Sequence, residues 1–85
     1  MTRDEIEKTM LDIFADQFEI ENPGLEDDLR EMHEFDSIDA IELLREIEIM
    51  IGTQLTREEK KAAMDIRTIR QIVDYVVNLD RSRLN

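Results

Sequence analysis

The residues best placed to do chemistry lie in one short stretch, Asp36-Ser37-Ile38-Asp39. Asp36 is a good N-cap residue, because its carboxylate can accept hydrogen bonds from unpaired backbone N–H groups two and three positions on. Asp39 then lies at the third helical position, where negative charge suits the positive end of the helix dipole. Ser37 falls in the first turn, where the backbone N–H groups and the dipole favour a phosphate ester on its oxygen. The stretch therefore presents one hydroxyl for modification at the start of a helix.

Other roles for these residues are a plain helix cap, phosphorylation, acid–base catalysis and metal binding. Taken alone, the four residues could simply be a well-capped helix start, or their acidic context could make Ser37 a kinase substrate. Asp36 and Asp39 are poorly suited to acid–base catalysis, since that work requires burial or a tight pair of carboxylates. The acidic clusters lack the alternating acids, central glycine and distal glutamate of a calcium loop. His33 stands without a second His or any Cys, so we assign no catalytic or metal-binding residue.

Helical spacing indicates how these residues are held. Apolar side chains recur at three- and four-residue steps after Asp36, which predicts a helix from Ser37 to about Ile51, and Gly52 is a natural stop. A capping box at Thr2 begins an earlier amphipathic helix, and Pro23-Gly24 signals a turn beyond it. Further boxes start a short helix from Thr56 to about Met64 and a last helix after Thr68. Residues 25–35 read as an irregular connection anchored by Leu25 and Leu29, and residues 81–85 as a frayed tail.

The motif around Ser37 is similar to that of a known protein family. Asp36-Ser37-Ile38-Asp39 followed by Ala-Ile-Glu-Leu-Leu resembles the attachment motif of acyl carrier proteins, usually Asp-Ser-Leu-Asp. Length, acidity and helix order are similar too, down to Val73-Asp74-Tyr75-Val76. The resemblance implies an all-α fold, a small four-helix bundle with three longer helices and a short third one, formed as a single domain over residues 1–85. Met10, Met50 and Met64 would fill gaps in its core.

The resemblance also implies a function and a set of site residues. Ser37 would carry 4′-phosphopantetheine, transferred from coenzyme A by a Mg-dependent transferase, and Asp36 would position Ser37 in that enzyme. Acyl groups would travel as thioesters on the arm between enzymes of fatty-acid, related lipid or polyketide biosynthesis, so the chain would not itself be an enzyme. The residues expected to contact partner enzymes are Ile38, Asp39, Ile41, Glu42, Arg45 and Glu48.

The chain departs from the family pattern at three places: before Ser37, at Arg45, and in the segment between the capping boxes at Thr56 and Thr68, which is a few residues longer than in the family. The family usually has Leu-Gly and one more residue before Asp-Ser, whereas this chain has His33-Glu34-Phe35, which removes a conformationally free glycine. Arg45 stands where the family usually has an apolar residue, often Met. These departures suggest a specialised carrier. A peptidyl or aryl carrier, or an acidic helical adaptor without a prosthetic group, is the alternative.

Composition limits the kinds of partner. The 85 residues carry a net charge of -11 and include no cysteine, so any thiol must come from a cofactor. Residues 1–59 hold 19 acids and five bases, whereas residues 60–85 hold three acids and six bases. Such a surface disfavours nucleic acid and anionic membranes and favours proteins with basic patches. No long apolar run or leader is evident, so we expect a cytoplasmic monomer.

Overall fold

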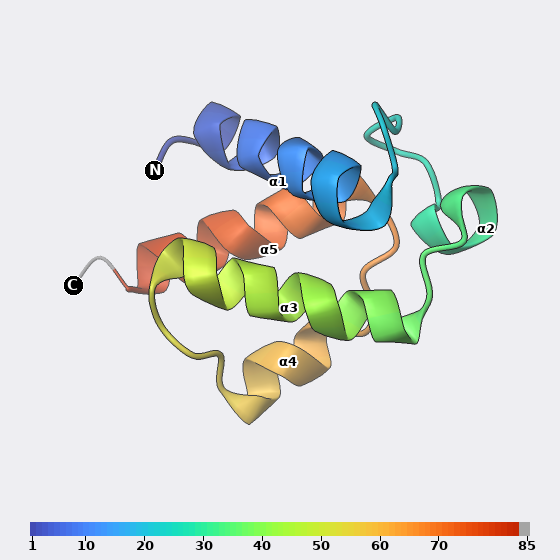
Figure 1. The fold of residues 1–85 in the computed structure, drawn as a ribbon. Helices are drawn as coiled ribbons and strands as arrows, with labels where there is room; N and C mark the ends of the chain where they lie inside the picture. The colour runs from blue at the N-terminus through green and yellow to red at the C-terminus, as the bar shows by residue number, and fades with distance from the viewer. Residues whose placement is uncertain (84–85) are drawn as a thin grey trace.

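The computed structural model, described here for residues 1–83, is helical throughout that range and contains no strand there (Figure 1). Its elements are α1 (Arg3–Phe18), α2 (Leu29–His33), α3 (Ser37–Ile51), α4 (Arg57–Ala63) and α5 (Ile69–Ser82). The predicted all-α class is confirmed, with three long helices and the short helix α4. No helix in this range is both long and apolar enough to cross a membrane.

Four helices begin at capping boxes. In each box the side chain of the N-cap residue accepts a hydrogen bond from the backbone N–H of the third helical residue, and the side chain of that third residue accepts one from the backbone N–H of the N-cap residue. The N-cap residues are Thr2, Asp36, Thr56 and Thr68, as the sequence predicts. Each box satisfies two of the backbone donors that a helix start leaves unpaired. Gly52 ends α3 in the left-handed conformation with φ of 75°. The local sequence therefore fixes where the long helices begin.

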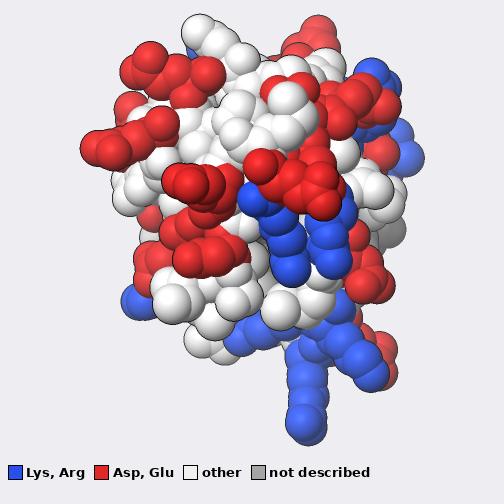
Figure 2. Space-filling view, turned by 90° about the vertical axis from the view of Figure 1, so that its right-hand side faces the viewer, with Lys and Arg blue, Asp and Glu red and all other residues white. Residues whose placement is uncertain are grey.

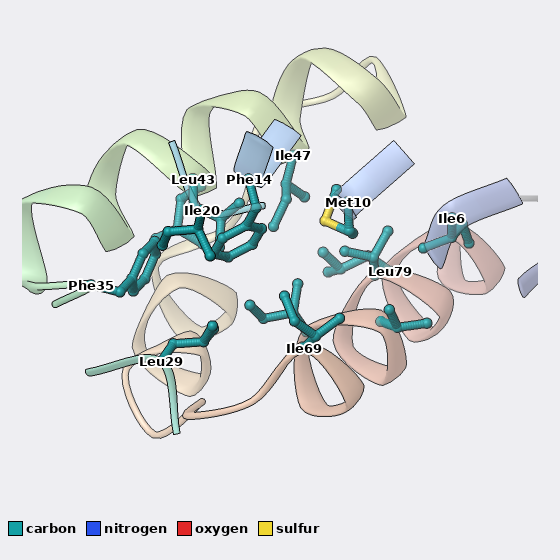
Figure 3. Packing of buried hydrophobic residues seen from close by; sticks show 14 of the residues in the cluster. Ile6, Met10, Phe14, Ile20, Leu29, Phe35, Leu43, Ile47, Ile69 and Leu79 are labelled. Atoms are coloured by element: carbon teal, nitrogen blue, oxygen red, sulfur yellow. The ribbon is translucent and has the colours of Figure 1, made fainter. Parts of the chain in front are cut away.

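The core is one apolar cluster formed between α1, α3 and α5 with contributions from the loops (Figure 3). Phe14 lies at its centre, fully buried, with its ring centroid 5.4 Å from that of Phe18 and 5.2 Å from that of Phe35. Aromatic pairs at these separations add to the stabilisation gained from burial alone. Phe35 immediately precedes Asp36, so this aromatic cluster anchors the start of α3 in the core.

The connection from residue 19 to residue 36 is more ordered than its sequence suggests. Asp28 caps the one-turn helix α2 by accepting hydrogen bonds from the N–H groups of Arg30 and Glu31, both at 3.0 Å. Leu29 is buried as predicted, and its N–H donates to the carbonyl of Arg67 at 2.8 Å. The connection is thus tied to the segment before α5, and describing it as irregular was wrong for residues 29–33.

Two further expectations from the sequence are wrong. The tail was expected to fray from Arg81, but α5 continues to Ser82, and Arg83 bonds to Glu59 through two nitrogens at 2.7 and 3.1 Å. That ion pair holds the end of α5 against α4; residues 84–85 lie outside the described range. Met64 was expected in the core, yet 41% of it is exposed, because α4 has no buried side chain and lies at the edge of the bundle.

Candidate functional site

Ser37 is the first residue of α3 and follows its N-cap directly. The carboxylate of Asp36 accepts a hydrogen bond from the N–H of Asp39 at 2.9 Å, and the carboxylate of Asp39 accepts one from the N–H of Asp36 at 3.2 Å. Both acids are therefore occupied in shaping the helix start. Ser37 itself is exposed, and its hydroxyl makes no hydrogen bond to any residue in the range 1–83. The hydroxyl oxygen of Ser37 is therefore accessible to a modifying reagent or enzyme.

Glu34 takes the backbone conformation that the missing glycine would have adopted in the turn between α2 and α3. Glu34 adopts φ 56° and ψ 30°, a left-handed conformation that glycine reaches without strain and other residues reach at a cost. The turn needed between α2 and α3 is therefore retained, although the glycine is not. The buried Phe35 on its C-terminal side holds the turn in place.

His33 has a structural role in the same turn. Its Nε2 lies 3.1 Å from Oδ2 of Asp27, and that same oxygen accepts a hydrogen bond from the N–H of Gly24 at 2.9 Å. The hydrogen bonds from His33 and from the Gly24 backbone lower the pKa of the Asp27 carboxyl. His33 and Asp27 together brace the connection that leads to Ser37.

Two apolar side chains lie exposed just after Ser37. Ile38 is 70% exposed and Ile41, one turn further along, is 55% exposed. Leu43, Leu44 and Ile47 turn into the core instead. Surface residues of this size, side by side on one helix, are typical of a protein contact. The family resemblance implied that Ile38 and Ile41 contact partner enzymes, which requires exposed side chains, and both side chains are exposed.

Acidic side chains lie beside these two isoleucines along α3, because Asp36, Asp39 and Glu42 are interspersed with them in the sequence. Figure 2 shows the molecule from the side where α2 and the start of α3 lie: Asp and Glu cover much of its upper part, and most of the Lys and Arg lie in its middle and lower parts. In Figure 1 the lower level is occupied by α4, which carries Arg57, Lys60 and Lys61. The arrangement of an apolar centre with a charged rim is typical of transient interfaces.

The remaining sequence-selected residues of α3 differ in what they contact. Glu42 is exposed and lies 3.7 Å from Arg45, which is itself 71% exposed at the side chain. Glu48 is half-buried, and its carboxylate accepts a hydrogen bond from the N–H of Leu55 at 2.8 Å. Glu48 therefore helps to hold the loop between α3 and α4, a contact that no feature of the sequence indicated.

A hollow of about 210 Å³ opens between α3 and α4, beside these residues. Its lining consists of Ile41, Leu44, Arg45, Glu48, Lys60 and Met64. A much smaller gap of about 20 Å³ lies deeper, among side chains of α3, α4 and α5 that include Ile47, Ile72 and Tyr75. Sequence reasoning missed Lys60 and Met64 at this site, because nothing in the sequence tells which face of α4 approaches α3.

Comparison with known proteins gives a consistent picture. The family described as "Phosphopantetheine attachment site" matches residues 8–76 of the chain. A curated protein named "Acyl carrier protein" from Rubrobacter xylanophilus is 37% identical over 79 residues, which cover 91% of this chain and 94% of that protein. No solved structure gave a significant match.

Proposed function

Because the chain belongs to the acyl carrier protein family, whose members hold a phosphopantetheine group, we propose that Ser37 is the residue that carries 4′-phosphopantetheine. The single observation that supports this assignment best is the free, exposed hydroxyl of Ser37 at the first position of α3. The only other serine, Ser82, donates its hydroxyl to the carbonyl of Leu79 at 2.8 Å, near the other end of the molecule.

The surroundings of Ser37 suit such a group. The first turn of α3 leaves backbone N–H groups without intrahelical partners, and these favour an anionic phosphodiester next to Ser37. Asp36 and Asp39 keep that turn in shape by bonding each other's backbone. When attached, the arm supplies a thiol, which the cysteine-free chain lacks, and acyl groups are carried on it as thioesters.

We further propose that residues 1–85 act as one domain, a cytoplasmic monomer that carries acyl groups between enzymes and catalyses no reaction itself. Its partners would be a phosphopantetheinyl transferase and acyl-handling enzymes of fatty-acid or specialised lipid or polyketide biosynthesis. Contacts with them would be made by the apolar Ile38 and Ile41, by the acids Asp39, Glu42 and Glu48, and by Arg45. The exposure of the two isoleucines supports this surface.

Modification by a broad-specificity transferase tests the attachment site. With coenzyme A and Mg²⁺, the wild-type protein should gain the mass of one phosphopantetheinyl group by intact-mass spectrometry. Ser37→Ala should gain none, while the matched variant Ser82→Ala should be modified fully. Unmodified wild-type protein after several transferases have been tried would favour the adaptor alternative, and modification of Ser37→Ala would place the arm elsewhere.

A further inference from the structure

The hollow between α3 and α4 differs in charge from the surface around it. Its walls combine the apolar side chains of Ile41, Leu44 and Met64 with the cations of Arg45 and Lys60. One acid, Glu48, also lines it, but the Glu48 carboxylate is half-buried and accepts the N–H of Leu55. A hollow with an apolar lining and two cations thus interrupts the acidic surface of α3.

Both cations are available for a new partner. The contact of Arg45 with Glu42, at 3.7 Å, is the longest ion pair within residues 1–83, and the others are 3.1 Å or shorter. Exposed i,i+3 pairs of this kind contribute little to stability and are easily exchanged. Lys60 is exposed, and within the described chain no carboxylate lies within ion-pair distance of it. Together the weakly paired Arg45 and Lys60, which has no ion pair within residues 1–83, offer a positive site to an incoming carboxylate.

The hollow lies in the middle of an exposed apolar stripe. Ile38 and Ile41 precede Arg45 on α3, and Ile49, which is 75% exposed, follows it on the same helix face. Ile38 and Ile49 are eleven positions apart, which corresponds to about 16 Å along the helix. A protein that docks along this stripe would therefore cover the hollow and remove its cations from water.

We propose that the hollow receives an Asp or Glu side chain of a partner enzyme, carried on a docking surface that places apolar side chains against Ile38, Ile41 and Ile49. This inference rests on the proposed carrier function and names the chemistry of its partner. An enzyme with a wholly basic patch would place Lys or Arg against Arg45 and Lys60, so like charges would meet and both would lose water. The hollow thus selects against such enzymes and for one that supplies a carboxylate.

The first experiment uses carriers that have already been loaded with phosphopantetheine and a hexanoyl group, each verified by intact mass. Hexanoyl transfer to a bacterial ketosynthase with a Lys- and Arg-rich docking patch is measured as kcat/KM. Arg45→Glu and Lys60→Glu should each raise kcat/KM about tenfold, mainly through KM, because they remove like charge from the contact. The matched variant Lys61→Glu, on the same helix but outside the hollow, makes the same change in net charge and should have little effect.

The reciprocal experiment changes the enzyme. Single Lys→Glu and Arg→Glu variants of the ketosynthase patch are assayed with wild-type carrier and with Arg45→Glu. At least one enzyme variant should gain activity with wild-type carrier and lose it with Arg45→Glu, which would place a carboxylate opposite Arg45. Equal gains from Arg45→Glu, Lys60→Glu and Lys61→Glu, or no enzyme variant that favours wild-type carrier, would overturn the proposal.

The experiments also distinguish failure of the carrier function from binding of the acyl cargo in the hollow. If the transferase fails to load the wild-type protein, the carrier function itself is refuted. If the protein loads normally, NMR of the carrier bearing a succinyl group can be compared with that bearing a butyryl group, in the absence of any enzyme. Shifts at Arg45 and Lys60 that appear only with the succinyl carboxylate would assign the hollow to cargo, and would overturn the partner inference.

Discussion

The ion pair between Glu59 and Arg83 is expected to be one of the main attachments of α4. Arg83 donates to both carboxylate oxygens of Glu59, at 2.7 and 3.1 Å, and only 25% and 20% of the Glu59 and Arg83 side chains are exposed. Hydrogen bonds from Arg83 and from the N–H of Thr56 lower the pKa of Glu59 from 4.5 to about 2. The charged form of Glu59 is therefore favoured in the folded protein.

The magnitude follows from that change in pKa. Each pKa unit corresponds to roughly 1.4 kcal/mol, so the full change would amount to about 3 kcal/mol. Part of it comes from Thr56, and part of the pair faces water, which screens it. We therefore expect Glu59→Gln to lower the free energy of unfolding by about 1–2 kcal/mol at pH 7. Glutamine can still accept the capping hydrogen bond, so the change removes mainly the charge.

The pH dependence gives the sharper test. Because the pKa of Glu59 is lower in the folded state, the unfolded state binds more protons between about pH 4.5 and pH 2. The stabilisation is complete above about pH 5.5 and decreases as the pH falls through 4.5 toward 2. The difference between wild type and Glu59→Gln, measured by urea unfolding at fixed salt, should accordingly shrink from pH 7 to pH 3.5.

The exposed ion pair between Arg3 and Asp74 provides a control for this test. The control variant Asp74→Asn breaks an ion pair with Arg3 in which both side chains are about half exposed. It should lower the free energy of unfolding by no more than about 0.5 kcal/mol. In a double-mutant cycle, Glu59→Gln and Arg83→Met should be coupled by about 1 kcal/mol. A loss from Glu59→Gln that stays constant between pH 7 and pH 3.5, or that equals the loss from Asp74→Asn, would refute the reasoning.

Two predictions concern the segment before α3 and the core. Glu34→Gly should raise the free energy of unfolding by about 0.5–1 kcal/mol, because Glu34 has φ of 56°; a lower urea midpoint would contradict this. Phe14→Leu should lower the stability by about 1–2 kcal/mol, because Phe14 is fully buried against two other aromatic rings, and thermal unfolding measures the loss. The same change at Phe18, which is only partly buried, should cost less, and equal losses would place the centre of the core elsewhere.

Much of the fold could be predicted from the sequence, because its information is local. The capping boxes at Thr2, Asp36, Thr56 and Thr68 use residues three positions apart, and Gly52 marks a stop without reference to the rest of the chain. The helix α2 was missed although Asp28 and Glu31 have the same spacing, since a single turn carries too little apolar periodicity to be noticed.

What the sequence could not supply depends on contacts between distant residues. Nothing near Arg83 indicates that it pairs with Glu59, 24 positions away, so the end of α5 was expected to fray. The exposure of Met64 and the position of Lys60 depend on which face α4 turns toward α3. At the candidate site, the sequence indicated Ser37 and its two flanking acids, but not the hollow beside Arg45.

The absence of buried side chains in α4 has a consequence for the motions of the protein. Releasing this helix exposes little apolar surface, so it requires much less free energy than unfolding the bundle. The links that oppose its release include the Glu59–Arg83 pair and the hydrogen bond, 2.6 Å long, from the Tyr75 hydroxyl to the Glu59 carbonyl. The amide protons of α4 should therefore exchange with deuterated solvent well before those of α1 and α5. The hollow beside α4 accordingly has one wall that can detach and return many times while the rest of the molecule stays folded.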